Sequence, residues 1–159
     1  MQKIAHLGRT MVKNFVTVGS SLDHCHVPGR STDPKERGAL SQSAVEIGMG
    51  IHNEPGAKHI ENKPSGEDLI KEMLELLLRE DDPERSFVKF NKDDDPVLII
   101  NNLGGMSSIE LGAIAAEART QIERDWNLRL SRVYCATYVT SLNAPGFNIS
   151  LLNHKRVSE

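Results

Sequence analysis

The sequence predicts an α/β protein: a mixed sheet with a strand–helix–strand crossover and helices packed on the sheet. The main observation is an unbroken apolar run at residues 97–100, typical of a strand covered on both faces. Ser107 and Glu110 form a capping box for a helix over 108–125, and a second strand pattern follows at 133–140. Strand, helix and strand in this order indicate a right-handed crossover between parallel strands.

Composition narrows the class of protein. A length of 159 residues suits one domain, and 38% hydrophobic with 26% charged residues is typical of a globular chain. A net charge of −3 argues against a protein that holds nucleic acid or anionic membrane by bulk charge. No apolar run approaches the roughly 20 residues of a membrane span, and no secretory signal is visible. Two cysteines without a spacing pattern suit a reducing compartment, so we expect a cytoplasmic protein.

The first third of the chain predicts one helix, one loop and one strand. Apolar residues recur at helical spacing from Ile4 to Phe15, which predicts a helix ending near Gly19. Because that apolar face needs a partner, we expect the chain to begin inside a larger structure. Proline and glycine punctuate residues 20–43, which predicts a long loop. Apolar residues then alternate with Glu and Gly over 44–51, which predicts a strand.

The remaining elements follow from capping and periodicity. Ser65 is placed to cap a helix whose apolar positions continue to Leu78, with acidic residues in its first turn. Residues 87–90 predict a short strand between two acidic connectors. Alternation over 147–151 predicts a last strand, antiparallel to its predecessor.

His52 is the first candidate for chemistry. On the predicted strand 44–51 it would share a face with Gly48 and Gly50, which leave a floor without side chains where a small molecule can approach. Glu54 is near enough in sequence to orient or polarise the imidazole. A neutral imidazole is a nucleophile and a proton acceptor near pH 7. On spacing alone, a turn histidine bonded to its own loop is the more frequent alternative.

The other polar clusters give weaker evidence for a functional site. Residues 23–26 (Asp-His-Cys-His) include zinc-binding types, but no second cluster follows, so a loop capped by Asp23 is favoured over a metal site. Residues 101–107 join a buried strand to a helix N-terminus, where backbone amides can face an anion. A tight turn bonded by its own asparagines explains them equally well. The acidic stretches 80–84 and 93–96 are interpreted as solvated connectors rather than a metal site.

Four segments occur in the order seen in dihydroxyacetone (glycerone) kinases. They are 18–29 (VGSSLDHCHVPG), 46–56 (EIGMGIHNEPG), 101–105 (NNLGG) and 140–147 (TSLNAPGF). The chain resembles the second half of the substrate-binding domain of the ATP-dependent eukaryotic type, from about Ile4 to Leu152. By this resemblance, residues 1–159 are a partial substrate-binding domain, its C-terminal subdomain, without the helical ATP-binding domain.

The resemblance implies a site and a reaction. In that family the histidine of the Gly-Ile-His motif, His52 here, attacks the ketone carbon of dihydroxyacetone and holds it as a covalent hemiaminal. Gly48, Gly50 and Glu54 would neighbour the substrate. The resemblance implies a phosphotransferase that uses ATP and Mg²⁺ held outside this chain, with glyceraldehyde as a further substrate. It also implies a homodimer, and no nucleic-acid or membrane partner.

The departures from the family leave alternatives open. The earlier half of the family's domain, with its Gly-His-Glu stretch and catalytic aspartate, has no counterpart here. We therefore do not expect this chain alone to turn over ATP; a gene fragment, a splice product and a split subunit all fit. The alternative function is a non-catalytic ligand-binding or regulatory module of the same fold. The flavin-nucleotide cyclising activity of animal members belongs to the nucleotide-binding parts and gains no support from this sequence.

Overall fold

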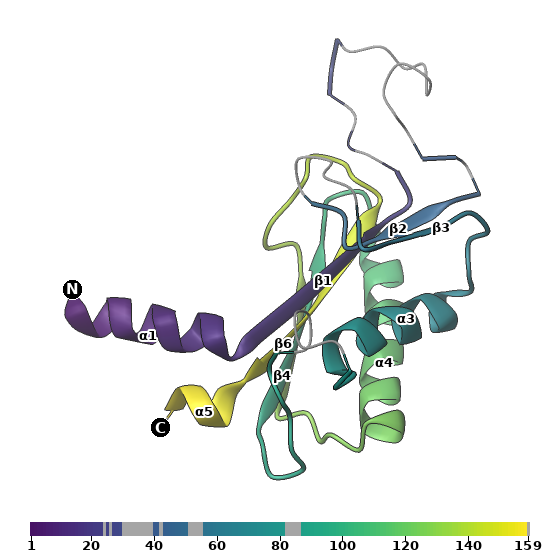
Figure 1. Ribbon diagram of the computed structural model, residues 1–159. Helices are drawn as coiled ribbons and strands as arrows, with labels where there is room; N and C mark the ends of the chain where they lie inside the picture. The colour runs from purple at the N-terminus through teal and green to yellow at the C-terminus, as the bar shows by residue number, and fades with distance from the viewer. Residues whose placement is uncertain are drawn as a thin grey trace.

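The computed structural model describes residues 1–23, 25, 27–29, 40–41, 43–50, 56–81 and 87–158. In chain order the elements are α1 (Gln2–Lys13), β1 (Phe15–Ser21), β2 (Val45–Ile47), β3 (Lys58–Ile60), α3 (Gly66–Leu78), β4 (Pro96–Asn102), α4 (Ser108–Asp125), β5 (Arg132–Ala136), β6 (Gly146–Asn153) and α5 (His154–Ser158). The strands form one mixed sheet in the order β3-β2-β1-β6-β4-β5, and α3 and α4 cover one face of it (Figure 1). The predicted α/β class is confirmed.

The strand pairing confirms the predicted crossover. Strands β4 and β5 pair in parallel, with Leu98 opposite Val133, and α4 connects them. Strand β6 is antiparallel to β4 and therefore runs opposite to its predecessor β5, as predicted, but it does not pair with β5. It inserts between β1 and β4, because six of its eight residues are buried and such a strand needs neighbours on both edges.

The N-terminal prediction is wrong at its end. The helix stops at Lys13, and Phe15–Ser21 forms a strand that pairs with β6 along its whole length, from Phe15 opposite Leu152 to Ser21 opposite Gly146. Helical spacing extended to Phe15 and hid the alternation of buried Val16 and Val18 that follows. Tertiary pairing with a central strand decided this segment.

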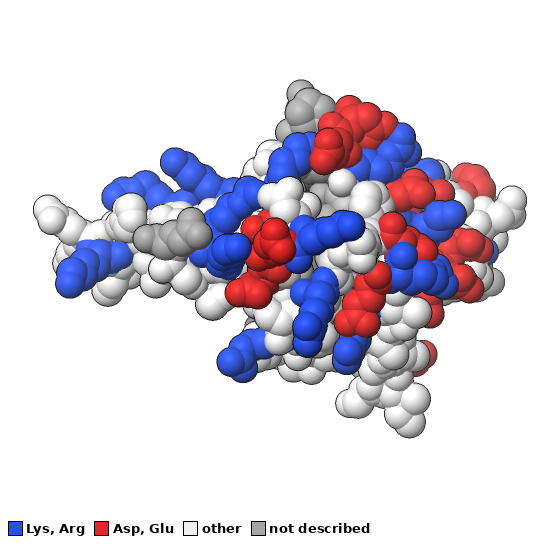
Figure 2. Space-filling view, turned by 90° about the horizontal axis from the view of Figure 1, so that it is seen from below, with Lys and Arg blue, Asp and Glu red and all other residues white. Residues whose placement is uncertain are grey.

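Helix α1 projects from the body of the molecule (Figure 1) and buries none of its residues. Ile4 is 74% exposed and Val12 is 72% exposed. The helix contacts α5 and the start of β1. Seen from below, its surface carries Lys and Arg among uncharged residues (Figure 2), and its sequence contains no acidic residue.

The β2–β3 region also differs from the prediction. The strand expected over 44–51 is only Val45–Ile47, because Gly48 adopts a φ of +80° and turns the chain away. A second strand, Lys58–Ile60, pairs with it antiparallel and was not predicted, since its one apolar residue, Ile60, makes no alternation.

Two further strand predictions need correction. Residues 87–90 form no strand, although Val88 is buried in the core. An apolar side chain there fills space under the helices without pairing its backbone into the sheet. The strand predicted over 133–140 ends at Ala136, where the register with β4 also ends.

The core lies between the sheet and the two helices. Side chains of α3, α4 and the central strands are fully buried there: Met73, Leu74, Leu98, Ile100, Ile122, Ile149 and Leu151. The predicted cap of α3 is confirmed, since the Ser65 hydroxyl accepts a hydrogen bond from the Asp68 amide at 3.1 Å. Gln121 is also buried, and its Nε2 donates to the Glu67 carbonyl at 2.9 Å, which ties α4 to the first turn of α3.

The predicted capping box of α4 is confirmed. The Ser107 hydroxyl accepts the Glu110 amide at 3.3 Å, and the Ser107 amide donates to Glu110 Oε2 at 2.8 Å. The Ser107 hydroxyl also bonds the carboxylate at 2.7 Å. These bonds, first that from the hydroxyl, favour the charged carboxylate and lower the pKa of Glu110 below its ordinary value.

Ser107→Ala is expected to lower the free energy of unfolding by about 1 kcal/mol at neutral pH, because the helix loses its N-cap. Glu110 has a depressed pKa when folded, so its share of the stability is lost as pH falls through that pKa. The difference between wild type and Ser107→Ala in urea unfolding should therefore shrink between about pH 7 and about pH 3. Thr120→Ala, at an exposed hydroxyl inside α4, is the control and should show no such pH dependence. An equal Ser107→Ala difference at both pH values would contradict this account.

Candidate active site

The carboxyl ends of three strands meet at one edge of the sheet. Strands β1 and β4 are both antiparallel to β6, and β5 is parallel to β4, so all three end beside the start of β6. Ser21 lies opposite Gly146, and Asn102 lies opposite Phe147. Figure 1 shows this edge at the top, where the connecting loops gather. In α/β sheets, ligands bind outside the carboxyl ends of the strands.

Asn101 fixes the loop that follows β5. Its Oδ1 accepts the amides of Tyr138 and Val139 at 2.8 and 2.9 Å, and its Nδ2 donates to the Val139 carbonyl at 2.8 Å. The residue is 8% exposed. One side chain at the end of a central strand therefore holds a neighbouring loop by three bonds.

Asn102 fixes the turn into α4. Its Oδ1 accepts the amides of Gly104 at 2.7 Å and Met106 at 3.3 Å, while its Nδ2 donates to the Met106 carbonyl at 2.7 Å. Of the two interpretations of residues 101–107, the turn bonded by its own asparagines describes this geometry. The signal in the sequence was the pair of asparagines followed, after Leu103, by two glycines.

The glycines of these loops allow backbone to pack on backbone. Gly104 has a φ of +124°, and a Cβ there would lie 2.0 Å from the Leu142 carbonyl oxygen. A Cβ on Gly146 would lie 2.3 Å from the Ser20 carbonyl oxygen. The Gly105 amide donates to the Ala144 carbonyl at 2.9 Å. The segments 101–105 and 140–147 therefore pack directly against each other where the strands end.

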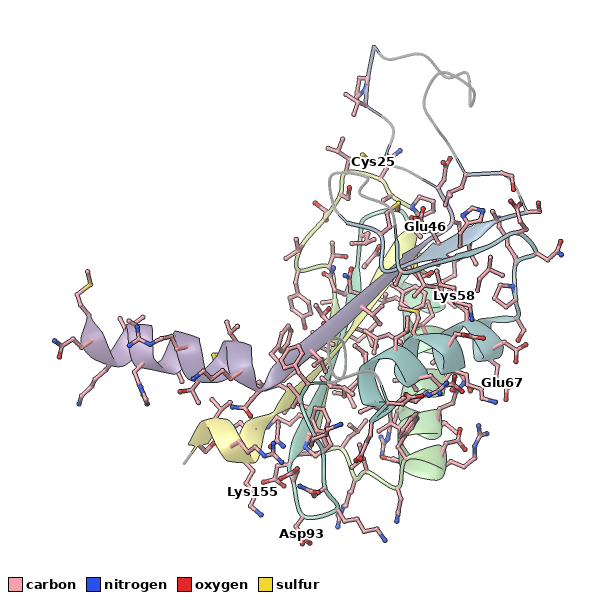
Figure 3. The ribbon with its side chains drawn as sticks, in the orientation of Figure 1. Cys25, Glu46, Lys58, Glu67, Asp93 and Lys155 are labelled. Carbon is pink, nitrogen blue, oxygen red and sulfur yellow. The ribbon has the colours of Figure 1, made fainter. Side chains whose placement is uncertain are left out.

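Residues 51–55, with His52 and Glu54, lie outside the described residues, as do His24 and His26. The chain on either side of residues 51–55 is held by strands β1 and β2. The Gly48 amide donates to the Gly19 carbonyl at 2.7 Å, and the Gly56 amide donates to the Glu46 carboxylate. Figure 3 shows Glu46 at the same end of the molecule as Cys25.

The predicted glycine floor depended on strand alternation up to residue 51. Since the strand ends at Ile47, that alternation does not reach Gly50. Gly48 has a different use: it turns the chain, and a Cβ there would lie 3.1 Å from the Ala57 amide nitrogen.

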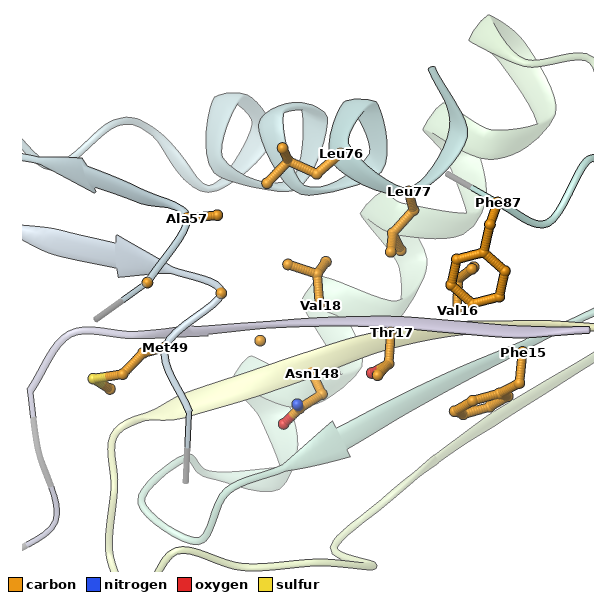
Figure 4. Close-up of a pocket in the computed structure, with 13 residues that line it drawn as sticks. Phe15, Val16, Thr17, Val18, Met49, Ala57, Leu76, Leu77, Phe87 and Asn148 are labelled. Atoms are coloured by element: carbon orange, nitrogen blue, oxygen red, sulfur yellow. The ribbon is translucent and has the colours of Figure 1, made fainter. Parts of the chain in front are cut away.

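A cavity of about 590 Å³ lies beside these turns (Figure 4). Gly48 and Ala57 stand at one end of it, and apolar side chains of β1 and α3 form its wall. A second cavity of about 340 Å³ lies at the sheet edge, between Ser21, Met106 and Phe147. Both volumes fall in the range of small-molecule sites.

The titratable groups in the described part of the chain form no metal site. No group of three or more His, Cys, Asp or Glu side chains that could hold a metal ion occurs there. Cys25 and Cys135 are both free thiols, and burial raises the pKa of the Cys135 thiol. His59 lies on β3 with its Nε2 3.3 Å from Glu61, and His154 lies in α5.

Lysine side chains tie neighbouring elements together on the described surface. Lys58 pairs with Glu72 between β3 and α3, and Lys155 donates to the Asp93 carbonyl at 2.9 Å (Figure 3). None of the helices within the described ranges is both long and apolar enough to span a bilayer.

Comparison with known proteins decides the family. Residues 1–159 match the profile of the Dak1 domain. The chain belongs to the Dak1 domain family. It is 40% identical to dihydroxyacetone kinase of Pichia angusta over 98% of this chain, and 43% identical to dihydroxyacetone kinase 1 of Saccharomyces cerevisiae over 98%. It is 32% identical to human triokinase/FMN cyclase over 96%. This Dak1 chain covers 27%, 26% and 25% of those relatives, about a quarter of their length.

Solved structures share the fold of this Dak1 chain. A dihydroxyacetone kinase operon co-activator matches with a TM-score of 0.79 at 20% identity, over 98% of this chain and 44% of its own. Dihydroxyacetone kinase from C. freundii, in complex with AMP-PNP and Mg²⁺, matches with a TM-score of 0.76 at 24% identity, over 96% and 26%. The resemblance found in the sequence is confirmed, and so is membership in a family whose relatives are named phosphotransferases.

Proposed function

We propose that this chain is the C-terminal subdomain of the substrate-binding domain of a dihydroxyacetone kinase, which phosphorylates dihydroxyacetone to dihydroxyacetone phosphate. The observation that carries the proposal is identity of 40% and 43% to two proteins named dihydroxyacetone kinase over nearly the whole chain. Because the chain spans about a quarter of those relatives, the full reaction needs residues outside it. ATP with Mg²⁺ supplies the phosphoryl group, and we assign their binding to a domain outside this chain.

The role assigned to this chain is capture of the ketose by His52. The lone pair of an imidazole nitrogen adds to the carbonyl carbon, and a C–N bond forms as the π pair of the carbonyl moves to its oxygen. That oxygen gains a proton and the imidazolium loses one, so the hemiaminal forms with no net gain or loss of atoms. Glycerol has no carbonyl, which would make the capture selective for ketoses and aldehydes.

The fold supports this role through the chain around His52. The Gly48 amide bonds the Gly19 carbonyl of β1, and the Gly56 amide bonds the Glu46 carboxylate of β2, so both sides of that segment are fastened to the sheet. The loops at the edge where three strands end are held by Asn101 and Asn102. Gly48 and Gly50 have no side chains, and Glu54 is the proposed neighbour that polarises the imidazole.

The test is carbon-13 NMR with dihydroxyacetone labelled at the carbonyl carbon. Hemiaminal formation turns a trigonal carbon into a tetrahedral one, so the wild-type chain should give a protein-bound signal distinct from the free hydrate. His52→Ala should abolish that signal. His59→Ala is the matched control, because this exposed histidine lies on β3 and is not assigned to the site. A bound signal that survives His52→Ala in folded protein would remove His52 from the mechanism.

A second function is favoured by one observation. The co-activator of a dihydroxyacetone kinase operon has the same fold, so the fold also occurs in a protein named as a regulator. A non-catalytic ligand-binding or regulatory module would bind dihydroxyacetone, if at all, without a covalent bond to His52. The same spectra separate the two functions, since only covalent capture produces the tetrahedral signal.

The relatives also suggest properties of the whole protein. We include glyceraldehyde as a further substrate, a cytoplasmic location and a homodimeric state in the proposal. Labelled glyceraldehyde in the same NMR experiment tests the substrate, and sedimentation equilibrium tests the dimer.

A further inference from the structure

The β2–β3 connection, residues 49–56, is closed at its base. The antiparallel register of β2 and β3 runs up to this connection. At the next position of the hairpin, a Cβ on Gly48 would lie 3.1 Å from the Ala57 amide nitrogen, so the two ends of the connection are in contact. His52 is midway in sequence between Gly48 and Gly56, and the way these ends are held therefore limits where its imidazole can lie.

Glu46 reaches across this base from β2. Its carboxylate accepts a hydrogen bond from the Gly56 amide. Gly56 packs so closely on β2 that a Cβ there would lie 2.5 Å from the Ile47 carbonyl oxygen and 2.7 Å from Glu46 Cγ. The lack of a side chain at residue 56 therefore allows the bond, and a hydrogen bond to a charged acceptor is stronger than one between neutral groups.

The backbone of Glu46 is itself fixed in the sheet. Glu46 lies opposite Ser21 of β1 and opposite His59 of β3. Its carbonyl accepts a hydrogen bond from the Ser20 hydroxyl at 3.2 Å. The residues on either side of it are fully buried in the core, and strand alternation directs the Glu46 side chain to the other face of the sheet, where it is half-buried. The carboxylate thus extends from a paired strand to the connection that carries His52.

We propose that Glu46 is a positioning residue for His52. By holding Gly56 to β2, its carboxylate restricts the backbone of the connection to conformations that present the imidazole to the substrate. The inference rests on the proposed function, in which His52 captures the ketose. It differs from the role proposed for Glu54, because Glu46 acts on the backbone of the connection and not on the imidazole itself. Without the bond, only a fraction of the molecules would be competent for capture, and the apparent affinity falls by that fraction.

Titration with carbonyl-labelled dihydroxyacetone, followed by the carbon-13 signal of the bound hemiaminal, measures this effect. Glu46→Ala removes the acceptor and should weaken the apparent affinity of capture about tenfold. Glu46→Gln keeps an acceptor oxygen at the same reach and should restore most of that affinity. Glu61→Ala is the matched control, because this exposed glutamate just after β3 bonds His59, and it should capture like wild type.

Urea unfolding of each variant shows that the affinities refer to folded protein. If Glu46→Ala does not fold, Glu46→Asp takes its place, since it keeps the charge and withdraws the carboxylate by one methylene. Glu46→Asp should weaken capture while Glu46→Gln does not, because the bond to Gly56 depends on reach and an acceptor oxygen.

A second measurement does not depend on capture. The carbon-bound imidazole protons of His52, observed by NMR without dihydroxyacetone, should shift in Glu46→Ala, while those of His154 in α5 should not. A wild-type chain that captures no dihydroxyacetone would remove the proposed function, and the His52 resonances would still decide whether Glu46 positions that residue.

Three outcomes would overturn the inference. Wild-type affinity in folded Glu46→Ala would show that capture does not use the bond to Gly56. Equal losses in Glu46→Gln and Glu46→Ala would assign the effect to the charge of residue 46 instead of its hydrogen bond. Identical His52 resonances in wild type and Glu46→Ala would show that the bond does not determine the position of the imidazole.

Discussion

Replacing Gly104 by alanine is expected to lower the free energy of unfolding by roughly 2–5 kcal/mol. The residue has a φ of +124°, which disfavours any side chain, and the added Cβ would lie 2.0 Å from the Leu142 carbonyl oxygen. That oxygen belongs to backbone, so the loop over 141–146 has to move. Urea unfolding followed by circular dichroism measures the loss.

The matched control for this glycine lies in α4. A Cβ added at Gly112 would meet no atom of another element within 4 Å, so alanine fits there. Gly112→Ala should raise the free energy of unfolding by about 0.5–1 kcal/mol through helix propensity. Equal effects of the two substitutions would show that the close approach at Gly104 does not constrain the loops. The Gly104→Ala chain should also lose the NMR signal of bound dihydroxyacetone, because both loops border the candidate site.

Leu98→Ala should be comparably damaging, at about 2–5 kcal/mol. Leu98 is 0% exposed and sits on β4, opposite Leu151 of β6 and Val133 of β5. Alanine would remove buried methyl groups and leave a cavity in the middle of the sheet. The measurement is the free energy of unfolding from urea titration, with the slope compared to wild type to confirm an unchanged two-state transition.

Ile109→Ala is the control for the core substitution. Ile109 is 87% exposed in the first turn of α4, so alanine there should change stability by less than about 0.5 kcal/mol. A Leu98→Ala chain as stable as the Ile109→Ala chain would contradict the placement of β4 in the core.

The predicted elements that proved correct depend on neighbouring residues. Ser65 and Ser107 cap their helices as predicted, because a cap is a contact between residues three apart in sequence. The apolar run at 97–100 became a strand for the same local reason, although only Leu98 and Ile100 join the core under the helices and Ile99 on the other face is half-buried. For the order strand, helix, strand, nearly all connections between parallel strands are right-handed, so one crossover was expected.

The elements that were missed depend on distant partners. Strand β1 follows a helix directly, and only pairing with β6, more than 100 residues away in sequence, separates the two. Strand β3 has one apolar residue, Ile60, and forms through its pairing with Val45–Ile47. The early end of that strand follows from the turn at Gly48, whose packing partner Ala57 cannot be read from spacing.

The candidate site also contains features that the sequence predicted and features that it did not. Its motifs were visible in sequence, and the order of those motifs identified the family before any fold was known. The roles of Asn101 and Asn102 were not predictable, because each amide bonds whichever loop the sheet places beside it. The role of His52 stays a prediction, which the NMR experiment tests.

The sequence by itself determined the fold class, the caps of α3 and α4, the crossover and the family, since all of these depend on local patterns or on the order of short motifs. The tertiary structure decided the position of β6 between β1 and β4, the meeting of the loops at one sheet edge, and the bond from Gly56 to Glu46. The physical reason is that strand partners are chosen by burial and backbone pairing between distant segments, and a strand's own alternation does not encode which neighbour it takes.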